Sequence, residues 1–468
     1  MEPDINKKTH QPIPLPTLAF IAWCSLTGLF LISTLVQYKV KGLDIFEALI
    51  QTGPISNRTL NLYSVGISWL LAGFFLYLLH SKKIHSRNVF AIAGFFLIGL
   101  LYLNVLRERP EYGDIQYYIR AANALHLDKH LPATYIYPPF WASLLEPLLQ
   151  LGKKAIFNLA WLANVGSLFV FYFLLILMLE QYGFSGKLAA LVTTIFMLVN
   201  VPILRTLFYV QVNLHVINLI FLSLLLLRRS PFISALALAM AVHLKVSPIL
   251  LVVAFILEKN WRWLFWFVFS TLLIGSFTVI NHGFSPYLDF FINIKNLIAS
   301  HEISFRENSI DSLFLAASNF LNLECALTRN VIYAVKLVIG VLGLAIVFKN
   351  IKGQTFYQSE GPGTCLYNGV IGLLILATLF SPLIWEHHGV FLALPFLVLL
   401  KRLSSGGEYA WFGFAYFFEF LLPTFDFFPW SYGRLFSALI CLGLCWYLSK
   451  KKDISPLFEA AESRLLNL

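Results

Sequence analysis

Apolar runs close to twenty residues long recur along this chain from its first tens of residues to its end. An α-helix needs about 20 apolar residues to cross the hydrocarbon core of a bilayer. Runs near that length predict an all-α, polytopic membrane protein. Twelve candidate spans, the shortest below that length, cover residues 17–38, 60–80, 88–106, 156–180, 187–203, 213–227, 261–280, 331–348, 366–380, 389–400, 409–422 and 435–448.

Composition excludes two other classes of protein. Of 468 residues, 58% are hydrophobic and 12% are charged, and no long polar stretch is present that could form a separate soluble catalytic domain. The net charge of +10 does not indicate a nucleic-acid partner, because the cations are spread over short loops and form no stripe. The five cysteines show neither metal-ligand spacing nor a disulfide framework.

Basic clusters between the runs indicate the topology, since cytoplasmic loops collect Lys and Arg. The clusters within 82–87, 228–229, 401–402 and 450–452 share one side only if the run 231–257 enters and returns on that side. This run is longer than one span and is interrupted by His243, Lys245 and Pro248. We therefore expect a broken re-entrant hairpin. The alternative is a single crossing, which would place Asp114 and His387 in opposite compartments.

This topology divides the chain into a membrane domain and two tails. We expect a disordered cytoplasmic tail over 1–16, a polytopic domain over 17–449 and a cytoplasmic tail over 450–468. The long loops 107–155 and 281–330 are then extracytoplasmic, as are the short loops 204–212 and 381–388. Amphipathic spacing within 117–125 predicts helices along the membrane surface in the first long loop.

Asp114 lies in the first of these long loops, beyond the third candidate span. A carboxylate at such a position suits a general base acting on a hydroxyl. Taken alone, the pattern favours a helix N-cap instead, because Asp is a preferred capping residue. Tyr137 in the same loop begins a Tyr-Pro-Pro turn, which is more typical of a rigid corner than of a substrate contact.

Lys245 is the most unusual single residue, because a cation inside an apolar run costs about 3 kcal/mol on insertion scales and requires a partner or a cavity. A structural salt bridge is one explanation, and a bound phosphate at the tip of the hairpin is the other. Gln211 and Asn213 lie where a loop becomes a span. Their amides suit either helix-end backbone groups or the hydroxyls of a sugar.

Glu386, His387 and His388 follow Trp385 in a segment without Lys or Arg. Two histidines and a carboxylate suggest zinc, but no further ligands follow at helical spacing, so we predict neither a metal nor a cofactor. We expect the histidines to donate hydrogen bonds to an anionic headgroup or a sugar. Glu386, with Asn308 and Ser309 of the loop 281–330, is a possible substrate contact, although a solvated loop explains most of that loop's polar residues.

The order of these motifs resembles glycosyltransferase family 87, whose members are membrane mannosyltransferase-like enzymes of GT-C architecture. The resemblance covers residues 113–400 and departs from the family at Glu307-Asn308-Ser309, where Asn-Gln-Ser is frequent. The motifs that carry it are Gly113-Asp114, Tyr137-Pro138-Pro139, Gln211-Val212-Asn213, His243-Leu244-Lys245 before Pro248, and Ser381-Pro382 followed by Trp385-Glu386-His387-His388.

The resemblance implies a polyprenyl-phosphate sugar as donor, a glycan or glycolipid as acceptor, and a bacterial inner membrane as location, with membrane lipids as further partners and no nucleic acid. It matches Asp114 to the family's catalytic aspartate, and Lys245, His387 and His388 to groups near the lipid phosphate and sugar. We therefore expect inverting transfer of a hexose, most simply mannose, on the extracytoplasmic side. The alternatives are a lipid-linked sugar transporter or flippase, for which an internal repeat is missing, and a polysaccharide ligase, whose chemistry overlaps.

Overall fold

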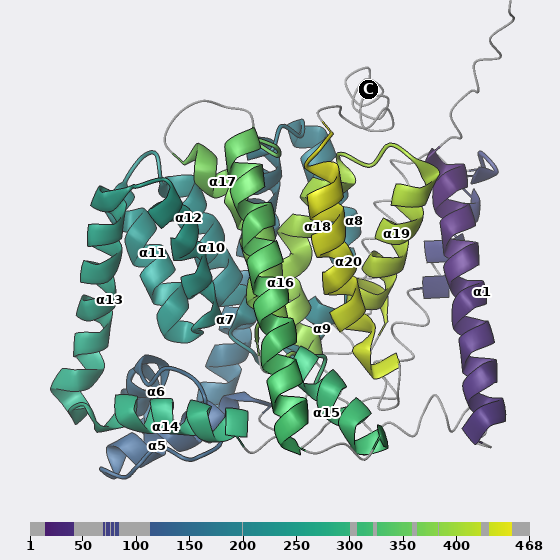
Figure 1. Ribbon diagram of the computed structural model, residues 1–468. Coiled ribbons are helices and arrows are strands. Elements are labelled where there is room, and N and C mark those ends of the chain that lie inside the picture. Colours follow the sequence, from purple (N-terminus) through teal and green to yellow (C-terminus); the bar gives the residue numbers. More distant parts are fainter. Residues whose placement is uncertain are drawn as a thin grey trace, which may run out of the picture.

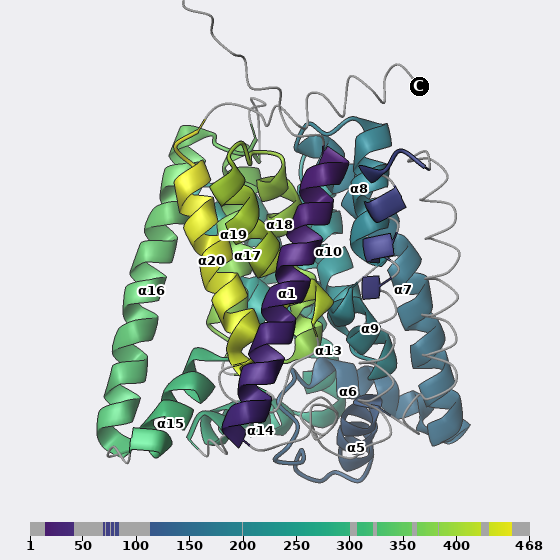
Figure 2. The same ribbon diagram turned by 90° about the vertical axis from the view of Figure 1, so that its right-hand side faces the viewer.

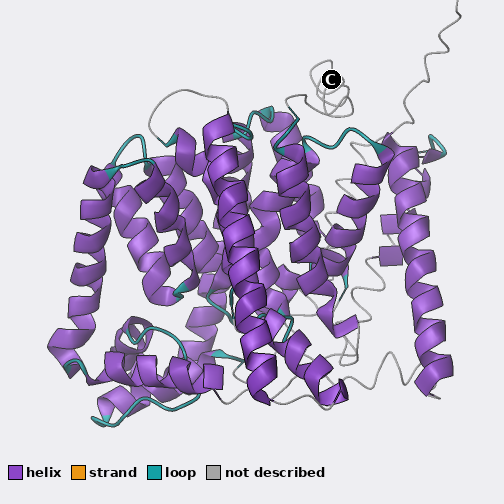
Figure 3. Ribbon diagram, in the orientation of Figure 1, coloured by secondary structure: helices purple, strands orange, loops and turns teal. Residues whose placement is uncertain are grey.

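The computed structural model describes residues 15–41, 69–83, 113–299, 307–321, 325–357 and 363–451, apart from positions 71, 75, 79, 199, 382 and 423–429. All regular elements in these ranges are helices, as Figure 3 shows. The candidate span 88–106 lies outside the described residues, as do most of the span 60–80 and nearly all of the two tails. The all-α prediction is confirmed for the part of the chain that is described.

Most of the helices stand side by side in one bundle, and a smaller group lies across one end of it (Figures 1 and 2). The helices of the bundle are α1 (Leu15–Lys41), α7 (Lys153–Gln181), α8 (Gly186–Leu198), α10 (Asn213–Leu226), α11 (Pro231–Leu244), α12 (Val252–Leu257), α13 (Trp261–His282), α16 (Cys325–Gly353), α17 (Thr364–Leu379), α18 (Ala393–Leu400), α19 (Gly406–Tyr416) and α20 (Gly433–Leu448).

The group at the lower end in Figure 1 comes from the two long loops that the sequence predicted. It contains α5 (Ile115–His126), α6 (Phe140–Leu145), α14 (Ser285–Ala299) and α15 (Ile310–Leu321), with α9 (Val201–Phe208) above it. Short turns of 3-10 helix are η1 (Glu146–Leu151), η2 (Ser247–Leu251), η3 (Glu386–Leu392) and η5 (Trp430–Tyr432), and η4 (Phe417–Leu421) is a π-helical turn.

Three of the described helices, α7, α13 and α16, are long and apolar enough to cross a membrane. Their surfaces carry large apolar side chains such as Leu272 and Leu337, each 68% exposed. An aqueous surface disfavours such continuous apolar faces, whereas lipid accommodates them. The protein is therefore a membrane protein, and the count of twelve spans stays a prediction.

The predicted span 187–203 differs from the structure. Helix α8 ends at Leu198, and α9 begins at Val201 at an angle of 63° to it. The Asn200 side chain accepts a hydrogen bond from the Ile203 N–H (2.9 Å) and caps α9. Much of the expected loop 204–212 is therefore a buried helix, because a capping residue inside the apolar run starts a new helix there.

The segment 231–257 turns back on itself in the structure. Helix α11 ends at Leu244, the chain is extended at Lys245, and Pro248 opens the short turn η2 that leads into α12. The Trp263 indole at the start of α13 donates to Ser234 in the first turn of α11 (2.9 Å). The two ends of the segment therefore lie at the same end of the bundle, as expected for a hairpin.

The described parts of the predicted basic clusters lie at the upper end of the bundle in Figure 1, opposite the long loops. Lys401 donates to the Tyr182 carbonyl between α7 and α8 (2.9 Å), and Arg402 donates to the Lys451 carbonyl after α20 (2.8 Å). Arg228, between α10 and α11, lies over the Tyr357 ring after α16. This asymmetry of charge is the one that topology rules associate with a membrane protein.

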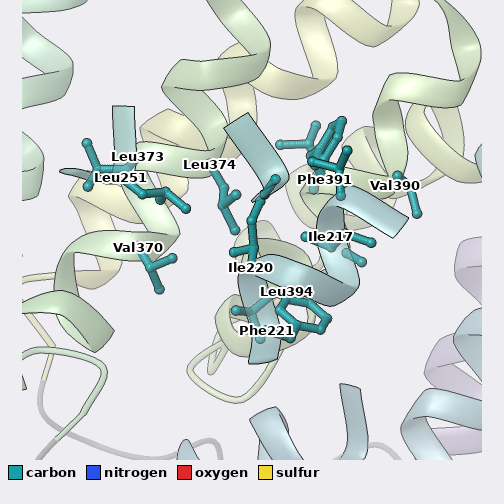
Figure 4. Close-up of a cluster of buried hydrophobic side chains, with 14 of the residues drawn as sticks. Ile217, Ile220, Phe221, Leu251, Val370, Leu373, Leu374, Val390, Phe391 and Leu394 are labelled. Carbon is teal, nitrogen blue, oxygen red and sulfur yellow. The ribbon is translucent and has the colours of Figure 1, made fainter. Parts of the chain in front are cut away.

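The tip of the hairpin lies against the core of the bundle. Side chains from α10, η2, α17, η3 and α18 interdigitate there, including Ile220, Leu251, Leu374, Phe391 and Leu394 (Figure 4). The density of this packing fixes where the extended residue Lys245 emerges. The core therefore positions the candidate site.

Candidate active site

Asp114 lies at the start of α5, against the turn between α9 and α10. Its backbone N–H donates to the Tyr209 carbonyl (2.8 Å). Gly113 permits this approach, because its φ is +47° and a Cβ there would lie 2.6 Å from the Tyr209 oxygen. Glycine is thus required immediately before the aspartate.

The Asp114 side chain does not cap α5, although Asp114 occupies the capping position. Its carboxylate instead accepts a hydrogen bond from the Gln211 amide, 97 residues further along the chain. Burial raises the pKa of Asp114 to about 6, while the Gln211 hydrogen bond and the charge of Lys245 oppose that rise. A partly dehydrated carboxylate with such a pKa suits proton transfer near neutral pH.

The turn that presents Gln211 is strained. Val210 has a φ of +53°, and the Gln211 N–H returns to the Thr206 carbonyl (2.9 Å), so Val210 occupies the left-handed position that glycine normally takes after a helix. A β-branched residue there costs about 1–3 kcal/mol. Strain of this kind, next to Asp114, directs the Gln211 amide toward the carboxylate.

Lys245 reaches the same region from the tip of the hairpin. Its ammonium donates to the Asn213 side-chain oxygen (2.9 Å) and lies 5.4 Å from the centre of the Phe391 ring. The Asn213 amide in turn donates to the His387 carbonyl (3.0 Å). Asp114, Gln211, Asn213, Lys245 and His387 therefore meet, although they come from α5, the α9–α10 turn, α10, the hairpin and η3.

His388 lies beside this group. Its Nδ1 lies within hydrogen-bond distance of both the Trp385 N–H (2.9 Å) and the Trp385 carbonyl (3.2 Å), so the position of the ring proton decides which of these bonds forms. His388 also lines a small cavity at the hairpin tip, together with Ser247 and Ser381. Within the described ranges, no three His, Cys, Asp or Glu side chains gather as metal ligands would.

Glu386, predicted as a possible substrate contact, is held by two buried arginines. Arg205 of α9 forms an ion pair with one carboxylate oxygen, and Arg434 of α20 lies 3.9 Å from the other. Glu419 is buried nearby and interacts with Arg434. The sequence reasoning did not single out Arg205, Arg434 or Glu419, although Glu419 was visible as a lone carboxylate within an apolar run.

Tyr137 stands in an aromatic cluster close to Asp114. Its ring centre is 4.8 Å from that of Tyr118 and 5.9 Å from that of Tyr135. Burial, with Asp114 nearby, raises the pKa of Tyr137 to about 12, so this hydroxyl stays protonated. Tyr118 and its neighbour Trp141 were not predicted as site residues.

Asn308 and Ser309 lie at the start of α15 and are buried. The Asn308 N–H donates to the Ile384 carbonyl (2.7 Å), and the Ser309 hydroxyl accepts from the Ser312 N–H (3.1 Å). The Asn308 hydrogen bond joins the second long loop to the segment before Glu386. In the structure, Asn308 and Ser309 therefore support the segment that carries Glu386, His387 and His388.

The fold and the site define a helical membrane protein whose buried polar site lies between the bundle and its end-on loop helices. The family model described as glycosyltransferase family 87 matches residues 135–382, slightly more than half of the chain. The chain belongs to this family and is a glycosyltransferase. The matched range contains Tyr137, Gln211, Asn213 and Lys245, and it leaves out Asp114 and the two histidines. No curated protein and no solved structure matches the chain significantly.

Proposed function

We propose that the protein transfers a hexose, most simply mannose, from a polyprenyl phosphate to a hydroxyl of an extracytoplasmic glycan or glycolipid, with inversion at the anomeric carbon. The observation that supports this proposal is that Asp114 and Lys245, from distant parts of the chain, lie close enough for the lysine charge to act on the carboxylate. A base for the acceptor and a cation for the leaving phosphate are the two charges that such a transfer needs.

In this scheme Asp114 accepts the proton of the acceptor hydroxyl as its oxygen attacks the anomeric carbon. The bond from that carbon to the phosphate oxygen breaks on the opposite face, and the electron pair leaves with the lipid phosphate. Lys245 balances the negative charge that grows there, since a fixed cation in a water-poor site stabilises it strongly. In the tautomer with the ring proton on Nε2, His388 donates from that nitrogen to the phosphate. Asn213, itself bonded to the His387 carbonyl, holds Lys245, and Gln211 holds Asp114.

The same proposal includes a GT-C architecture with about twelve spans and a location in the bacterial inner membrane. A polyprenyl tail would stay between the helices while the reacting carbon meets the site at the end of the bundle. The basic residues at the opposite end favour an extracytoplasmic site. Flippase and ligase functions are the alternatives: a flippase needs no general base, whereas the chemistry of a ligase overlaps with the proposed transfer.

The experiment that tests this function replaces Asp114 and measures transfer of mannose from polyprenyl-phosphate mannose in membranes. Asp114→Asn keeps the shape of the side chain and removes the base, so we expect at least about a hundredfold loss of rate. Asp128→Asn is the matched control, because Asp128 is exposed after the end of α5. Unchanged transfer by a normally expressed Asp114→Asn protein would overturn the mechanism.

A further inference from the structure

Next to Asp114, three buried polar atoms have no partner of ordinary hydrogen-bond geometry within the described part of the chain. They are the Tyr118 hydroxyl, the Trp141 indole N–H and the Gln211 Oε1. A buried group of this kind costs about 1–3 kcal/mol, and native proteins contain few of them. Three such atoms at one place indicate a ligand that supplies the missing hydrogen-bond partners.

Two of these atoms belong to one continuous set of rings, and the third belongs to the Gln211 amide that holds Asp114. Tyr118 lies one helical turn after Asp114, so both side chains share a face of α5. The Tyr118 ring is 4.8 Å from Tyr137 and stands edge-on to Trp141, with ring centres 6.4 Å apart. The cluster therefore extends from the carboxylate along α5 to the first turn of α6.

Packing alone does not explain the cluster. Tyr135, in the same cluster, uses its hydroxyl in a hydrogen bond to the Pro138 carbonyl (3.2 Å), as a buried structural tyrosine normally does. Tyr118 is equally buried, at 0% exposure, yet its hydroxyl makes no hydrogen bond of normal geometry and has only the Tyr137 hydroxyl beside it. The contrast between the two tyrosines separates a structural role from one that involves a ligand.

The chemistry of the cluster fits a pyranose ring. Two of the open groups are donors and one is an acceptor, and each sugar hydroxyl is both. Aromatic side chains with a few convergent polar groups are the usual lining of a small-molecule site. A lipid chain would satisfy none of the three groups, and a phosphate would satisfy the donors but be repelled by the adjacent carboxylate.

We infer that Tyr118, Trp141 and Gln211 form the subsite that binds the acceptor sugar, with the reacting hydroxyl directed at Asp114. This inference rests on the proposed function, because it assigns the acceptor side of that same reaction. The inference places the sugar donor and the sugar acceptor on opposite sides of the polar side chains around Asp114. Lys245 and His388 face the sugar donor, and the rings of α5 and α6 face the sugar acceptor.

The test uses the full chain in phospholipid nanodiscs, since sugar-based detergents would compete. Saturation-transfer NMR with methyl α-mannopyranoside and methyl α-glucopyranoside measures binding without a donor. Tyr118→Phe and Trp141→Phe each remove one polar atom and keep a ring, and we expect each to weaken binding about three- to tenfold. The controls are Tyr333→Phe and Trp411→Phe, at residues that are 56% and 60% exposed on α16 and α19.

Thermal unfolding supplies a readout that a structural role would not give. Because the Tyr118 hydroxyl makes no hydrogen bond of normal geometry and only meets the Tyr137 hydroxyl, Tyr118→Phe should lower the melting temperature less than Tyr135→Phe does, or leave it unchanged. In transfer assays, Tyr118→Phe should raise the KM for the acceptor glycoside without changing the KM for the donor.

The outcomes separate this inference from the proposed function. Pyranoside binding that is unaffected in both ring variants, or no binding by the unaltered protein, overturns the subsite. Binding that depends on Tyr118 and Trp141, with no transfer from any polyprenyl-phosphate sugar, overturns the proposed reaction and leaves the subsite standing.

Discussion

The pKa of Asp114 leads to a direct prediction about the pH dependence of catalysis. With a pKa of about 6, the carboxyl is about nine-tenths ionised at pH 7 and about one-tenth ionised at pH 5. Because the base works only when ionised, kcat/KM for transfer should fall about tenfold between pH 7 and pH 5. An aspartate with its ordinary value of 3.8 would lose less than about a tenth of its activity over that range.

The assay is kcat/KM from pH 4.5 to 8 in nanodiscs, for the unaltered protein and for Gln211→Leu. The Gln211 hydrogen bond stabilises the ionised carboxylate, so its loss should move the acidic limb to higher pH. A profile that stays flat down to pH 5, or a limb that Gln211→Leu leaves in place, would refute the assignment of Asp114 as the base.

The raised pKa of Asp114 also predicts how the stability of the folded protein depends on pH. The folded-state pKa lies above the ordinary value of 3.8, so the carboxyl favours folding when protonated, and this contribution is lost as the pH rises through about 6. The difference corresponds to about 3 kcal/mol at most. Asp114→Asn should therefore raise the melting temperature at pH 7.5 more than at pH 5, and an equal effect at both pH values would contradict the burial of this carboxyl.

Three other changes test the fold around the site. Gly113→Ala places a Cβ 2.6 Å from the Tyr209 carbonyl and should reduce transfer at least about tenfold by displacing the aspartate; normal activity would contradict the close approach. Glu386→Gln leaves two buried arginines without their shared carboxylate and should lower the free energy of unfolding by about 3–5 kcal/mol. The measurement is the melting temperature, and an unchanged value would contradict the burial of this ion pair. Cysteines introduced at the exposed positions Arg229 and Lys259 should react with an impermeant thiol reagent from the same side of the membrane, whereas labelling from opposite sides would exclude the hairpin.

The sequence located most of the helices because the signal for a span is local. A run of apolar residues reports the free energy of transferring that segment into lipid, independently of its neighbours. Residues 156–180 and 261–280 were predicted this way, and α7 and α13 extend only a few residues beyond them. The broken run around Lys245 and the distribution of basic residues also predicted a hairpin, since both depend on charge near a membrane.

Local patterns failed where a polar residue inside an apolar stretch has a distant partner. The loop expected at 204–212 is largely the helix α9, and its Arg205 pairs with Glu386, which lies 181 positions further along the chain. The spacing of charges cannot reveal such a pair, because burying an arginine is tolerable only once tertiary structure supplies its carboxylate.

The candidate site also combines features that the sequence predicted with features that only tertiary contacts decide. From the sequence alone, Asp114 was more simply a helix cap, and the residue types allowed either role. In the structure the Asp114 carboxylate accepts from Gln211 and does not cap α5. The Tyr118 hydroxyl lies beside Tyr137 without a hydrogen bond of normal geometry, while the Tyr135 hydroxyl donates to the Pro138 carbonyl. The chain's hydropathy determined that it forms helices in a membrane and where most of them begin, because that free energy belongs to each segment by itself. Only the packing of α5, the hairpin and η3 decided which polar groups meet, because hydrogen bonds and ion pairs depend on distances between segments that no local pattern contains.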